Sequence, residues 1–205
     1  VIVAQNGGAA LFYTPPGDMD TANRLAAWLM AQPWCGTVTA SDAVAGIPGT
    51  LPASLAGTEG SRAPDLTVSF RWETTANETG YPGMIPSTYG GPGKGQHGSM
   101  SQMEIRNILF ASGPSFKSNI TLETPSGNQD LAPTILKILG IEGDNGMDGR
   151  VLAEALVDGP SAADVNWSTK THQAELDLGG EVYRQQIKVS TVGTTSYLDE
   201  GNRVD

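Results

Sequence analysis

Short apolar runs separated by turn residues open the chain and predict a β-hairpin followed by a helix. Residues 1–4 and 10–14 are mainly apolar and flank Asn6–Gly8, in which Asn-Gly is the strongest short-range signal for a hairpin turn. Apolar side chains then recur at helical spacing over residues 20–32. The helix is expected to end before Pro33, because the residue before a proline disfavours helical geometry.

The middle of the chain alternates between strand-like segments and loops. A strand is predicted at residues 34–40, and residues 65–71, which alternate apolar with polar positions, predict another. Residues 77–96 form a long polar stretch rich in Gly and Pro. Unstructured loops of that length in compact domains are usually functional or mobile. Residues 107–111 then predict a further strand.

The C-terminal part of the chain predicts two helices and a hairpin. Residues 130–139 carry an apolar helical face that Gly140 would end, and a shorter helix is expected at 150–156. Residues 181–192 and 194–198 read as antiparallel strands around Gly193. This succession predicts an α/β fold: a mixed sheet with flanking helices, plus a terminal β-hairpin.

Composition narrows the classes of function. The chain has 205 residues and a net charge of -10, which opposes binding to nucleic acid or to an anionic membrane, since both need a basic footprint. No run reaches the about 18 apolar residues of a transmembrane helix. Cys35 is the single cysteine, so no intrachain disulfide forms, and we expect it to be a small buried residue in a strand.

His97 is the candidate for chemistry, because it lies in Gly95–Gly98 with a glycine on each side of the Gln-His pair. Glycines let backbone and imidazole approach a ligand closely, and neutral imidazole is a common zinc ligand. The competing interpretation is an ordinary turn residue. His172 lies in a polar stretch and is expected to be an ordinary exposed residue. Two histidines cannot complete a zinc site, which needs at least three ligands.

The P-loop and the nucleophile elbow, two common catalytic motifs, are absent from the sequence. Gly93–Gly95 contains a lysine, but no Ser or Thr follows it, which a phosphate-binding P-loop requires. No Gly-x-Ser-x-Gly nucleophile elbow occurs. Ser99 and Ser101 lie near His97, and we expect their hydroxyls to serve a turn or a helix cap.

A run of motifs gives the chain a family resemblance. Gly95–Gly98 is followed by Met103–Lys117, which ends in Gly-Pro-Ser-Phe-Lys, then by a helix-like Asp130–Ile141 and by Asp148–Leu152. In order and spacing this resembles the C-terminal metal-binding segment of the alkaline phosphatase superfamily, most closely its type I phosphodiesterase/nucleotide pyrophosphatase branch. The resemblance covers residues 1–158, which leaves 159–205 as a polar extension.

The resemblance implies the C-terminal part of an alkaline-phosphatase-like α/β sandwich in a secreted or periplasmic phosphohydrolase acting on small phosphate esters. Two metal ions, usually zinc, would flank a Thr or Ser nucleophile, and His97 would be one ligand of one ion. The nucleophile and the other ligands would lie upstream of Val1, which itself looks like mid-strand. The chain is therefore expected to be a fragment and inactive alone. The alternative is a non-catalytic binding or structural module that keeps the fold; substrate and oligomeric state stay open.

Overall fold

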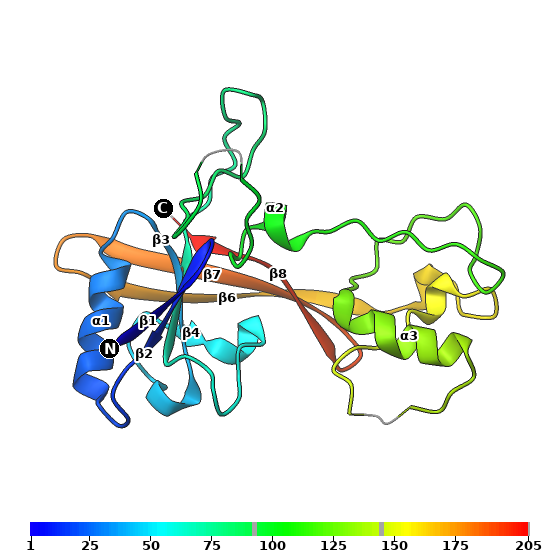
Figure 1. Ribbon diagram of the computed structural model, residues 1–205, viewed down its shortest axis with the longest axis horizontal. Coiled ribbons are helices and arrows are strands. Elements are labelled where there is room, and N and C mark those ends of the chain that lie inside the picture. Colours follow the sequence, from blue (N-terminus) through cyan, green and yellow to red (C-terminus); the bar gives the residue numbers. More distant parts are fainter. Residues whose placement is uncertain (92–93, 144–145, 205) are drawn as a thin grey trace. The chain divides into compact units, whose positions relative to one another are not determined.

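The computed structural model describes residues 1–91, 94–143 and 146–204, which form two compact units along the chain shown in Figure 1. The first unit consists of Val1–Asn107, Thr171–Val189 and Leu198–Asp205, and the second of Ile108–Lys170 and Ser190–Tyr197. The sequence analysis divides the chain at residue 158, where the family resemblance ends. That boundary stays a prediction.

A five-stranded mixed sheet forms the centre of the first unit. Its strands, in the order β1-β2-β5-β3-β4, are β1 (Ile2–Asn6), β2 (Ala9–Tyr13), β5 (Leu66–Phe70), β3 (Cys35–Ala40) and β4 (Leu51–Pro52). All neighbours are antiparallel except β3 and β4. Every residue of β3 and β5 is buried, as expected for strands covered on both faces. The first hairpin and the strands predicted at 34–40 and 65–71 are thus confirmed.

Helix α1 (Met19–Met30) packs against β3 and β5 (Figure 1). Asp18 caps it by accepting a hydrogen bond from the Thr21 backbone N–H at 3.0 Å, which satisfies a donor that the first turn leaves free. Its apolar face, including the fully buried Leu29 and Met30, joins the main hydrophobic core. The predicted helix at 20–32 is therefore confirmed. Cys35 is buried in this core, as expected.

A three-stranded antiparallel sheet in the order β6-β7-β8 follows. The strands are β6 (Trp167–Asp177), β7 (Val182–Val192) and β8 (Thr195–Arg203). The β7–β8 pair confirms the predicted terminal hairpin. Strand β6 was not predicted, because its residues are mostly polar and exposed and so lack the hydrophobic alternation of a half-buried strand.

The remaining helices are short. They are α2 (Gln102–Ile105) and α3 (Leu131–Ile138), together with 3-10 turns at Asp42–Val44, Ala53–Ala56, Asn128–Asp130, Ala153–Ala155 and Ala162–Asp164. Helix α3 confirms the helix predicted at 130–139, and Gly140 follows it with φ of 65°, as a left-handed C-terminal glycine does.

Two predicted elements are wrong. Residues 107–111 form no strand; Ile108 and Phe110 are 82% and 88% exposed, and a strand needs a neighbour that the described residues do not supply. The helix predicted at 150–156 shrinks to the 3-10 turn Ala153–Ala155. The first turn of that helix does not form. The backbone N–H groups of Arg150 and Leu152 instead donate to the side chains of Asp130 and Thr134.

Candidate functional site

The loop that carries His97 is fixed to the β1–β2 turn by its backbone. The N–H of Gly8 donates to the His97 carbonyl at 2.9 Å, and the N–H of Thr88 donates to the Gly7 carbonyl at 2.9 Å. These two hydrogen bonds attach both ends of the segment 88–97 to one turn. Pro92 and Gly93, inside that segment, lie outside the described residues, and the expected mobility of the loop stays a prediction.

Two glycines permit this close crossing of loop and turn. A Cβ on Gly98, where φ is 98°, would lie 2.1 Å from the Asn6 carbonyl oxygen. A Cβ on Gly7, where φ is 62°, would lie 2.3 Å from the His97 carbonyl oxygen. Both the backbone conformation and the available space therefore require glycine at these positions.

The imidazole of His97 is exposed, so the structure uses the backbone of this residue for packing and leaves the ring at the surface. An exposed neutral ring has a nitrogen lone pair available to a metal ion. His172 lies half-buried on β6 rather than fully exposed. Among residues 1–91, 94–143 and 146–204, no group of three or more His, Cys, Asp and Glu is placed to hold a metal.

The hydroxyls after His97 serve local structure, as predicted. Ser99 donates from both its N–H and its Oγ to the Glu104 carboxylate, at 3.0 and 2.7 Å. Ser101 caps α2 by accepting from the Met103 N–H at 3.2 Å, and Ser69 on β5 accepts from the Met100 N–H at 2.8 Å. The Glu104 carboxylate thus joins the Ser99 hydroxyl to its own backbone N–H, and the Ser101 hydroxyl is used as a helix cap.

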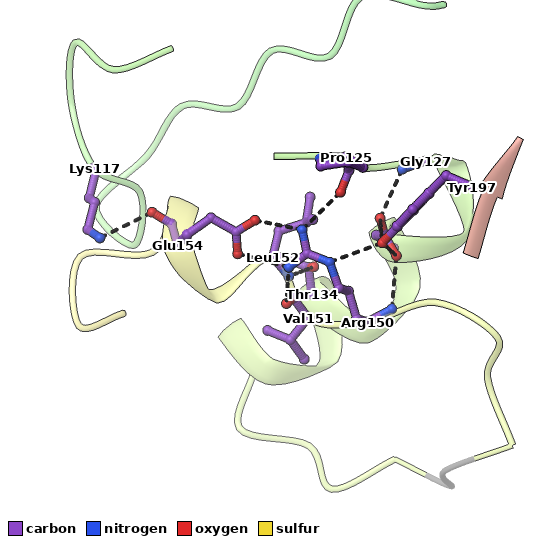
Figure 2. Close-up of polar contacts among 10 residues, drawn as sticks. Lys117, Pro125, Gly127, Thr134, Arg150, Val151, Leu152, Glu154 and Tyr197 are labelled. Atoms are coloured by element: carbon purple, nitrogen blue, oxygen red, sulfur yellow. Dashed lines mark hydrogen bonds and ion pairs between the residues drawn. The ribbon is translucent and has the colours of Figure 1, made fainter. Parts of the chain in front are cut away.

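A second polar cluster, inside the second unit, was not recognised as a site from the sequence. Asp130, Arg150, Glu154 and Tyr197 are joined by hydrogen bonds, and Figure 2 labels Arg150, Glu154 and Tyr197 among them. The Asp130 carboxylate accepts from the Gly127 N–H at 2.9 Å, the Arg150 N–H at 2.8 Å and the Tyr197 hydroxyl at 3.0 Å. Asp130 is fully buried, and these three donors compensate for its lost solvation.

The guanidinium of Arg150 uses every donor it has. It forms a two-point ion pair with Glu154 at 2.9 and 2.6 Å and donates through Nε to the Tyr197 hydroxyl at 3.0 Å. The carbonyls of Pro125 and Val151 accept its remaining N–H groups. An arginine with five N–H groups already bonded has none for a phosphate, so the cluster is a structural clamp.

The charges of the clamp shift its pKa values. Burial acts to raise the pKa of Glu154, but hydrogen bonds and the charge of Arg150 outweigh it, and the net pKa is lowered. Burial and the neighbouring Asp130 carboxylate raise the pKa of Tyr197 to about 12. Asp130 and Arg150 belong to motifs visible in the sequence, whereas Tyr197 arrives from the β7–β8 hairpin, so only the fold could add it.

No protein-family model, curated protein or solved structure matches this chain. Within the part of the chain that the structure describes, no helix has both the length and the apolar character to cross a membrane. The mixed α/β character is established by the two sheets and the helices.

Proposed function

We propose that this chain is the C-terminal part of an alkaline-phosphatase-like sandwich in a metal-dependent phosphohydrolase, similar to type I phosphodiesterases and nucleotide pyrophosphatases. The observation that carries the proposal is the order and spacing of motifs from Gly95 to Leu152. The placement of His97 supports it, since the ring is exposed while the backbone is anchored to the β1–β2 turn. We propose the same small phosphate-ester substrates and the same secreted or periplasmic location.

His97 fits the role of one zinc ligand and no more. The described residues contribute no group of three metal-ligating side chains, and zinc requires at least three protein ligands. We therefore propose that the other ligands of a two-zinc centre, and the nucleophile, belong to a further part of the full-length protein. Bound zinc would polarise the phosphoryl oxygens of the substrate. This chain would contribute the imidazole of His97, whose backbone carbonyl accepts a hydrogen bond from the Gly8 N–H.

The test uses the whole gene product that contains this sequence, with His97→Ala compared with His172→Ala. Zinc content is measured by elemental analysis, and hydrolysis of bis(p-nitrophenyl) phosphate is followed by absorbance. His97→Ala should lower the rate of hydrolysis about tenfold to a hundredfold and should also lower the zinc content. His172→Ala should keep both the rate and the zinc content of the unchanged protein. Equal zinc content and equal rates in His97→Ala and the unchanged protein would remove His97 from the site.

A non-catalytic binding or structural module is the second candidate. It is favoured by the second polar cluster, in which the donors of Arg150 and the carboxylate of Asp130 are fully engaged within the protein. A whole gene product that folds but holds no zinc and hydrolyses no phosphate ester would support this candidate over the hydrolase.

A further inference from the structure

The ammonium group of Lys117 lies among three backbone carbonyls of one turn. Its Nζ donates to the carbonyl oxygens of Glu154 and Gly159 at 3.1 Å each, and to that of Pro160. Figure 2 shows the first of these contacts. A lysine ammonium has three N–H donors and no acceptor, so the three carbonyls use its full capacity.

The turn that carries the three carbonyls is closed by hydrogen bonds within its own backbone. The Leu156 N–H donates to the Ala153 carbonyl, and the Gly159 N–H donates to the Leu156 carbonyl, both at 3.0 Å. A Cβ on Gly159 would lie 1.6 Å from the Ala153 oxygen, so glycine is required for this tight path. These contacts shape the turn without help from the lysine side chain.

A short backbone pairing joins Lys117 to the same turn. The Lys117 N–H donates to the Ala155 carbonyl at 2.9 Å, and the Val157 N–H donates to the Ser115 carbonyl at 3.0 Å. Phe116 and Leu156 form the antiparallel bridge between these two contacts. The main chain therefore brings position 117 to the carbonyls even when its side chain is shortened.

The surroundings suit a cation of single charge. Carbonyl oxygens that converge on one point replace the hydration shell of K⁺ in proteins, and the ammonium ion presents the same charge to them. The Glu154 carboxylate adds negative potential, and Lys117 is one of the charges that lower the pKa of Glu154, after the larger effects of burial and Arg150. Ca²⁺ favours several carboxylates among its ligands, whereas the three oxygens that bind the Lys117 ammonium are all backbone carbonyls.

We propose that the turn Ala153–Pro160 is a monovalent-cation site that Lys117 fills from within the chain. Removal of the lysine side chain opens the site to a free ammonium ion or K⁺. The inference is independent of the proposed hydrolase activity, because it concerns contacts inside the second unit and no residue near His97.

Thermal unfolding of Lys117→Ala tests the site in choline, sodium, potassium and ammonium chloride at equal ionic strength. Lys170→Ala, which removes an exposed lysine, is the matched control. The Tm of Lys117→Ala should be at least about 2 °C higher in ammonium or potassium than in choline. The unchanged protein and the control should show no such difference. Equal Tm values for Lys117→Ala in all four salts would overturn the proposal.

A labelling experiment on the unchanged protein decides the matter if Lys117→Ala folds in none of the salts. Trace acetylation followed by peptide mass spectrometry compares Lys117 with the exposed Lys94 and Lys170. An ammonium with three carbonyl partners should react at least about tenfold more slowly, since it must first leave them. Reaction of Lys117 at the rate of Lys170 would show that the carbonyls do not hold it.

Discussion

The side-chain amide of Gln185 pairs with the backbone of Val38 as a neighbouring strand would. Its Oε1 accepts from the Val38 N–H at 2.9 Å, and its Nε2 donates to the Val38 carbonyl at 3.0 Å and to the Gly49 carbonyl. Strand β4 pairs with β3 only at Thr39 and Ala40, so Val38 would otherwise present two unpaired groups in a buried place. Gln185 satisfies both.

A second amide repeats this arrangement at the end of β5. Asn202 on β8 accepts from the Trp72 N–H at 3.3 Å and donates to the Trp72 carbonyl at 2.8 Å. The Tyr183 hydroxyl adds a hydrogen bond to the Gly36 carbonyl at 3.0 Å. Within the first unit, β7 side chains therefore bond to the backbone of β3, and Asn202 of β8 bonds to the backbone of Trp72, two residues after β5.

Gln185→Met should lower the free energy of unfolding by about 2–4 kcal/mol, because it leaves the Val38 N–H and carbonyl buried without partners. Urea denaturation followed by tryptophan fluorescence measures the change. Gln173→Met alters an exposed glutamine on β6 and should stay within about 0.5 kcal/mol of the unchanged protein. A cost for Gln185→Met as small as that of the control would contradict the pairing.

The ion pair between Glu154 and Arg150 should make stability depend on pH in the acid range. The pKa of Glu154 is lowered in the folded protein, because the hydrogen bonds and charge of Arg150 outweigh the effect of burial. A group with a lowered folded pKa stabilises the protein above its unfolded pKa, and that contribution disappears as pH falls through the folded value. Glu154→Gln abolishes the contribution at every pH.

The measurable quantity is the gap in unfolding free energy between the unchanged protein and Glu154→Gln. It should be roughly 2–4 kcal/mol near neutral pH, since the change leaves a largely buried Arg150 charge unpaired. It should narrow as pH falls below the ordinary glutamate value of 4.5. Glu175→Gln breaks an exposed pair with Arg184 and should cost under about 1 kcal/mol. A gap that stays constant from neutral to acid pH would argue against the assignment.

Gly98→Ala should destabilise the first unit more than Gly17→Ala. Both glycines have positive φ, 98° and 77°, but a Cβ on Gly17 meets no atom within 4 Å, whereas one on Gly98 would lie 2.1 Å from the Asn6 oxygen. The backbone strain is shared, so the difference isolates the crowding, which should add about 1–3 kcal/mol. Equal unfolding free energies for the two variants would mean that the loop does not cross the turn this closely.

Local signals in the sequence were sufficient for some elements and not for others. The hairpin at Asn6–Gly8 and the helix capped by Asp18 each follow from a few adjacent residues, and both are present. Residues 107–111 have strand-forming side chains but no neighbour among the described residues, so the same rule failed there. A strand is a property of two segments, and one segment cannot show whether the other is in reach.

The His97 loop and the cluster around Asp130 also differ in how far local sequence reveals them. His97 could be found because the glycines beside it are visible in the sequence, and glycine is what the crossing at Gly98 demands. Tyr197 could not be assigned to Asp130, because the contact joins residues 67 positions apart. The sequence also predicts a helix at 150–156, where Arg150 is instead held by the clamp and its N–H donates to Asp130.

His97→Ala separates a structural role from a chemical one. The fold uses the His97 carbonyl, which accepts from the Gly8 N–H, and alanine keeps that carbonyl. The imidazole is exposed, so its removal should change the free energy of unfolding by less than about 0.5 kcal/mol. We expect this chain to bind zinc weakly through His97, so the same substitution should abolish binding measured by isothermal titration calorimetry, while His172→Ala should keep it. A stability loss above about 1 kcal/mol would assign the ring to packing, and unchanged zinc binding would remove it as a ligand.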